Sequence, residues 1–134
     1  MKGEEIIFAL LSTSPALAAV VPAARIAPGV IPQGTTLPAI AYSHISSVDS
    51  PMLGTRPALQ VRSRIQVTVA AGSYAAKKDL LDLVRKACNG KRGQITGVQV
   101  FNVRRDIVGP DIDSAEAKVY TQPIDFLVQF REPV

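Results

Sequence analysis

Residues 59–69 constrain the fold more than any other part of the sequence, because their apolar and polar side chains alternate almost without a break. Ser63 is the one polar residue on the apolar side, whose other members are Leu59, Val61, Ile65, Val67 and Val69. Alternation with a period of two predicts a β-strand that is buried on one face and wet on the other. The chain therefore has to build a sheet and cover one side of it with other elements.

Three segments have the features of helices that can cover such a sheet. Residues 4–11 form an apolar run behind two glutamates, and Ser14-Pro15 predicts a short helix that ends near residue 21. Ser73 is a suitable N-cap for a third helix, which we expect to end at Asn89-Gly90. The apolar stripe of this helix follows the spacing of one helical face and consists of Leu80, Leu83, Val84 and Ala87.

Three further strands are expected from their alternation and content of β-branched and aromatic residues, at 39–46, 94–105 and 117–131. Pro123 lies inside the last of them and has no N–H to donate, so we expect an edge strand or a bulge there. The segments between the strands are predicted to be exposed loops, at Ser47–Pro57 and Ile107–Glu116.

The resulting order is α-β-β-α-β-β, which predicts an α+β fold. We expect a two-layer sandwich in which a mainly antiparallel, four-stranded sheet packs against helices. The length of 134 residues suits a single domain, residues 1–134, because a second core would leave each half marginally stable.

Composition argues against an enzyme, a cofactor-binding protein and a metal site. The sequence has one His, one Cys and no Trp. His44 has no acid or nucleophile near it in sequence, and Cys88 falls on the apolar face of its helix, so both are predicted to be structural. The segment 111–116 resembles a calcium loop but lacks the glycine and the final glutamate that such a loop requires. We expect no catalytic residues and no cofactor.

No apolar run approaches the ~18 residues of a membrane span, so no membrane partner is expected. Glu4 and Glu5 stand where a secretory signal would carry positive charge, which favours a cytoplasmic start.

Charge is segregated along the second half of the chain. Residues 83–105 contain six basic side chains and no acid, whereas residues 106–116 contain four acids and no base. A third, basic group surrounds the wet face of the alternating strand, at Arg56, Arg62 and Arg64. Such runs form solvated surface, contact phosphates, or meet across a self-association interface.

Short motifs follow one another in a distinctive order along the chain. A helical start leads to a proline- and glycine-rich turn, a Leu-Pro step into a strand, an Arg-x-Gln strand, and a helix that ends on a glycine. These stretches are Ile6–Leu11, Ser14–Leu17, Arg25–Gly34, Leu37–Tyr42, Arg64–Ala71 and Leu83–Gly90. Their order resembles tail-completion proteins of long-tailed bacteriophages and prophages, with Cys88 in place of the usual leucine.

This resemblance implies a tail-terminator type of neck protein. Such a protein forms a six-membered ring on the head-proximal end of the tail tube, assembles in the host cytoplasm and resides in the virion tail or neck. Its partners would be further copies of itself, the tail-tube protein, the head–tail connector protein and, without sequence specificity, genomic DNA in the lumen. The alternative is a small ligand-binding or regulatory α+β domain without catalytic activity, which would need a sizeable apolar pocket.

Three groups of residues are candidates for contacts in such a ring. The subunit interface is expected to pair one basic and one acidic group, namely Arg104, Arg105, Asp111 and Asp113. The exposed loop that docks on the tail tube or the connector contains Asp49, Met52, Leu53 and Arg56. A basic face that meets DNA or a neighbouring subunit is expected at Arg62 and Arg64.

Overall fold

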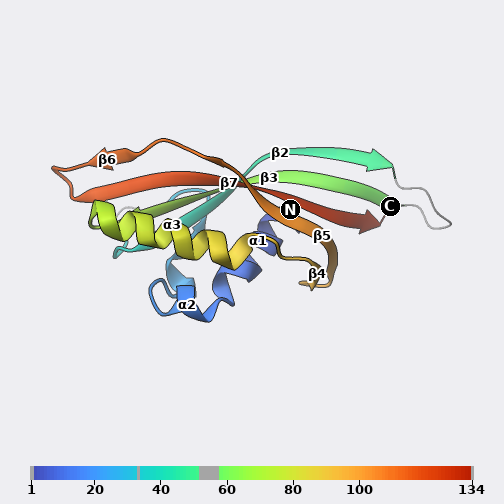
Figure 1. Ribbon diagram of the computed structural model, residues 1–134, viewed down its shortest axis with the longest axis horizontal. Helices are drawn as coiled ribbons and strands as arrows, with labels where there is room; N and C mark the ends of the chain where they lie inside the picture. The colour runs from blue at the N-terminus through green and yellow to red at the C-terminus, as the bar shows by residue number, and fades with distance from the viewer. Residues whose placement is uncertain (1, 33, 52–57, 134) are drawn as a thin grey trace.

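The computed structural model describes residues 2–32, 34–51 and 58–133 (Figure 1). Its helices are α1 (Lys2–Ser12), α2 (Pro15–Ala18) and α3 (Tyr74–Cys88), with a 3-10 turn η1 (Ala23–Arg25). The strands are β1 (Ile26–Pro28), β2 (Ala39–Pro51), β3 (Ala58–Ala71), β4 (Gly93–Ile95), β5 (Val98–Val108), β6 (Ile112–Ser114) and β7 (Val119–Pro133).

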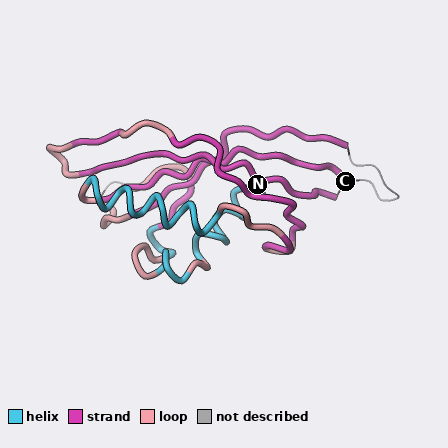
Figure 2. The backbone as a smooth tube through the Cα atoms, in the orientation of Figure 1, coloured by secondary structure: helices cyan, strands magenta, loops and turns pink. Residues whose placement is uncertain are grey.

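The seven strands form one mixed, strongly twisted sheet with the order β1-β2-β3-β7-β5-β4, and β6 pairs with β7. Strand β1 runs parallel to β2, whereas the other pairs are antiparallel. Half of the chain is strand, and the sheet curls into a half-barrel with its few helices on one side (Figure 2). The predicted four-stranded sandwich was therefore wrong. Strands β1 and β6 were missed because each is only three residues long, which is too short to show an alternating pattern, and β4 was merged with β5 in the strand predicted at 94–105.

The core lies between the helices and one face of the three longest strands. Antiparallel pairing of β3 with β7 brings Val61 opposite Phe130 and Ile65 opposite Phe126, and all four side chains are buried. Helix α3 contributes the stripe predicted for it, and helix α1 adds its own buried side chains, Ile6, Ile7 and Leu11. The alternation at residues 59–69 is thus confirmed, with the apolar side facing the helices.

The predicted loops and the predicted place of Pro123 needed correction. Strand β2 continues to Pro51, so the first part of the expected loop 47–57 is strand, and residues 52–57 lie outside the described part. Pro123 lies inside β7, which pairs with β3 on one side and with β5 and β6 on the other, so of the two predicted alternatives the edge strand is wrong. A register irregularity lies close to it, between Arg105 and Val108 of the neighbouring β5, which agrees with the predicted bulge.

Helix α1 begins in direct contact with the sheet at Gly3. A Cβ atom at this position would lie 2.9 Å from the Cβ of Ser63, closer than side-chain atoms normally approach. The glycine therefore fixes how near the first turn of α1 can come to β3.

We predict that Gly3→Ala lowers the free energy of unfolding by about 1–2 kcal/mol, because overpacking a core position costs about 1–3 kcal/mol and alanine regains part of that cost as a better helix former. Gly72→Ala is the matched control, since a Cβ there would meet nothing within 4 Å. Urea denaturation of the two variants measures the difference. Equal stability of Gly3→Ala and the unsubstituted chain would show that the contact of α1 with Ser63 is looser than described.

Candidate assembly surfaces

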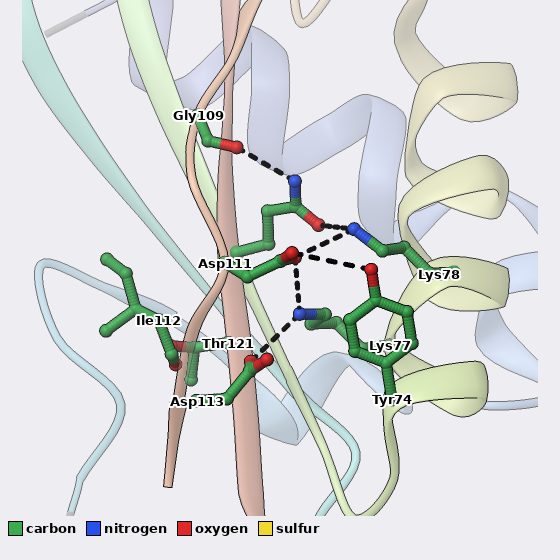
Figure 3. A network of polar contacts seen from close by, with 9 residues as sticks. Tyr74, Lys77, Lys78, Gly109, Asp111, Ile112, Asp113 and Thr121 are labelled. Atoms are coloured by element: carbon green, nitrogen blue, oxygen red, sulfur yellow. Dashed lines mark hydrogen bonds and ion pairs between the residues drawn. The ribbon is translucent and has the colours of Figure 1, made fainter.

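A buried lysine joins the start of α3 to the β5–β6 segment (Figure 3). The side chain of Lys77 is fully buried, and its Nζ lies 2.7 Å from Asp111 Oδ1 and 2.9 Å from Asp113 Oδ1. Lys78 Nζ lies 2.8 Å from the same Asp111 oxygen and donates to Gln122 Oε1 at 2.5 Å. Gln122 in turn donates from Nε2 to the carbonyl oxygen of Gly109 at 2.8 Å.

This lysine clamp, made of Lys77, Lys78, Asp111, Asp113 and Gln122, is electrically balanced within the chain. Hydrogen bonds from Lys77 and Lys78 lower the pKa of Asp111 to about 2. Two predicted interface acids, Asp111 and Asp113, thus already have partners inside the subunit. Their pairing with arginines of another subunit stays a prediction, and such pairs would have to form in addition to the contacts with Lys77 and Lys78.

The pKa of Asp111 has a consequence for stability in acid. A carboxyl whose pKa is about 2 when folded and ~3.9 when unfolded stabilises the fold above pH 4. That contribution is lost as the pH falls from 4 towards 2, since protonation then removes the charge that the lysines bind.

We predict that the stability of Asp111→Asn falls less steeply between pH 4 and pH 2 than that of the unsubstituted chain. The measurement is the urea midpoint at several pH values in this window. Asp79→Asn serves as the control, because Asp79 is exposed on α3 and has no ion pair among the described residues. The same slope for all three proteins would contradict the clamp.

The two predicted interface arginines lie next to each other in β5 but point to opposite faces of the sheet. Arg104 is half exposed, 4.0 Å from Asp106, on the face without helices. Arg105 is exposed on the helix side, where it lines a hollow of about 310 Å³ together with Lys78 and Val108. Its backbone N–H donates to Asn89 Oδ1 at 2.9 Å.

The predicted basic face is the uncovered side of the sheet, but only part of it presents net charge. Arg64 Nη1 lies 2.5 Å from Asp106 Oδ2 and 3.3 Å from Asp125 Oδ2, so this arginine is neutralised in place. Arg62 is exposed and has no ion pair within the described ranges. It borders a shallow hollow of about 150 Å³ lined also by Val48, Ser50, Gln60 and Gln129.

Of the four predicted docking residues, the structure describes one. Asp49 is exposed in β2 and lines a hollow of about 500 Å³ between this strand and α1. The other three candidates, Met52, Leu53 and Arg56, lie outside the described residues.

His44 and Cys88, the two residues considered as candidates for catalysis, both make structural contacts. His44 Nε2 lies 2.6 Å from Ser47 Oγ, which lies 2.8 Å from the buried Ser63 Oγ, so this chain of contacts satisfies a polar group in the core. The sequence did not predict these contacts, because a bulge between His44 and Ser46 shifts the register of β2 against β3. Cys88 is buried as predicted, and burial raises its pKa to about 12, far from that of a nucleophilic thiol.

Within residues 2–32, 34–51 and 58–133, no group of three or more potential metal ligands comes together. None of the helices described is long and apolar enough to cross a membrane.

Comparison with known proteins gives the decisive observation. The sequence model of the family described as "Tail completion protein gp17" matches residues 5–122, which is most of the chain. The chain belongs to this tail-completion family. It is accordingly a structural protein of a phage tail, and the resemblance inferred from its turn and helix motifs is confirmed.

The tail-completion chain also shares its fold with a solved structure. A chain in the structure titled "Virion of native gene transfer agent (GTA) particle" matches with a TM-score of 0.68 and 12% sequence identity. The match covers 96% of the tail-completion chain and 93% of that chain, so the twisted sheet and its helices are reproduced over nearly the whole length. No curated protein matches the sequence.

Proposed function

We propose that this tail-completion protein closes the head-proximal end of the tail tube as a ring of six copies and allows the head to join. The observation that carries the proposal is the family match over residues 5–122. The ring would stop growth of the tube and present a surface to the head–tail connector, with assembly taking place in the host cytoplasm.

The surfaces described above support a role in assembly rather than in catalysis. Cys88 is buried, and the His44 ring contacts Ser47 in a chain of hydrogen bonds that ends on the buried Ser63. Exposed charge remains on both sides of the sheet, at Arg62, Arg104 and Arg105. A head-to-tail ring needs two different patches on each subunit, and a sheet with charged margins can supply them.

The contacts with other components follow from the same geometry. The predicted docking residues, Asp49, Met52, Leu53 and Arg56, would contact the tail-tube protein or the connector. The uncovered sheet face around Arg62 would line the lumen, where genomic DNA passes and contacts it without reading its sequence. Arg104 and Arg105 would belong to the contact between subunits.

We predict that a strain lacking this gene produces DNA-filled heads without tails together with tails of excessive length. The physical reason is that an uncapped tube keeps adding subunits and offers no surface for the head. Electron microscopy of the lysate, with tail lengths measured individually, tests this. Complementation by the intact gene is the control, and it should restore joined particles of uniform tail length.

Joined particles with normal tails in the deletion strain would contradict the proposal. Tails of normal length that remain unjoined would show that the protein acts in head–tail joining and does not terminate the tube.

A further inference from the structure

The two margins of the sheet differ in how well their backbone is protected. Along β5, strand β4 pairs with Val98–Val100, and the turn after α3 covers the next residues. There, the Gly90 N–H donates to the Val103 carbonyl at 2.7 Å and Asn89 Oδ1 accepts from the Arg105 N–H at 2.9 Å. Backbone groups that already have partners do not accept another strand, so this margin is closed.

The margin along β2 is open. Strand β1 pairs only with Ile40–Tyr42, so residues 43–51 have β3 on one side and no strand of the described chain on the other. This β2 edge carries no Lys or Arg, and Ile45 and Val48 are 49% and 54% exposed. A long edge with unpaired N–H and C=O groups and exposed aliphatic side chains favours addition of another strand.

A second open edge lies at the far end of the molecule. Strand β6 pairs only with β7 among the described strands, and Figure 1 places it opposite the end of β2. Ile107 and Ile112 beside this β6 edge are 54% and 59% exposed. The lysine clamp holds the β6 edge in position, since both of its acids belong to this segment.

We propose that the β2 edge of one copy adds to the β6 edge of the next copy, so that one sheet continues from subunit to subunit around the ring. This inference rests on the proposed ring function and names its contact surface. The two edges differ and lie at opposite ends, which is the requirement for a head-to-tail contact that closes on itself. Ile45 and Val48 would then be covered by Ile107 and Ile112 of the neighbour.

Charge supports the choice of a second copy as the occupant. The β2 edge presents the exposed carboxylate of Asp49, so a contact between two β2 edges would bring like charges together. At the β6 edge, Asp111 and Asp113 are already matched by Lys77 and Lys78, so this edge opposes Asp49 less, which favours the head-to-tail arrangement.

Cross-linking tests the contact in assembled particles. The double variant Val48→Cys/Ile112→Cys replaces the chromosomal copy, and purified particles are treated with a short bismaleimide; the native Cys88 is buried and stays unreacted. We expect a ladder of covalent oligomers that ends at the ring size, and at least tenfold less product from either single variant. Dimers from Val48→Cys alone would show a twofold contact and overturn the proposal.

A charge at the edge gives an independent readout. Val48→Lys should lower the amount of the protein in particles at least tenfold, because a buried lysine at the added strand would be unpaired. Val30→Lys is the matched control, an exposed valine outside both edges that should leave incorporation unchanged.

The outcomes separate this inference from the proposed function. If the unsubstituted protein is absent from particles, the proposed function fails. If the protein is present in particles but the double variant gives no ladder, or if Val48→Lys is incorporated normally, only the edge-to-edge contact fails.

Discussion

The buried ammonium group of Lys77 is the constraint on which the shape of this subunit depends. A charge removed from water must be matched by opposite charge, and Asp111 and Asp113 supply it from a segment that lies more than thirty residues further along the chain. The match fixes β6 and the end of β5 against the first turns of α3. Without it, the short β6 would have only its three pairs with β7 to hold it.

The same interaction determines what this end of the subunit presents to solvent. Because the lysine clamp uses Asp111 and Asp113, the subunit presents at this end an ordered strand edge with aliphatic side chains rather than a free acidic patch. The open edge of β2 lies at the other end (Figure 1). A small chain with one open edge at each end is suited to repeat head to tail, whereas the margin covered by Asn89 and Gly90 limits growth in other directions.

Sequence patterns predicted the elements whose periodic pattern extends over many residues. They failed for strands that form only by pairing with segments far away in the sequence. Residues 59–69 and the helix capped by Ser73 show their period locally, and the structure confirms both. The three short strands have no period of their own and form only because β2, β5 and β7 offer partners. Pro123 left an edge strand and a bulge as alternatives, because the register shift beside it lies in β5, a strand that comes earlier in the chain.

The candidate contact residues were predictable as charged groups but not as surfaces. Strand alternation sends Arg104 and Arg105 to opposite faces, and Arg64 is neutralised by acids that are 42 and 61 positions away in sequence. The family was recognisable instead from the order of turns and helix ends, which are local motifs that can be read without knowing the fold.

A density map of the head–tail junction of purified particles tests the central claim most directly. The account predicts a ring of six copies of this fold between the tail tube and the connector, with β2 of each copy beside β6 of its neighbour. The protein located elsewhere in the particle, or a ring in which subunits meet through their helices, would contradict it.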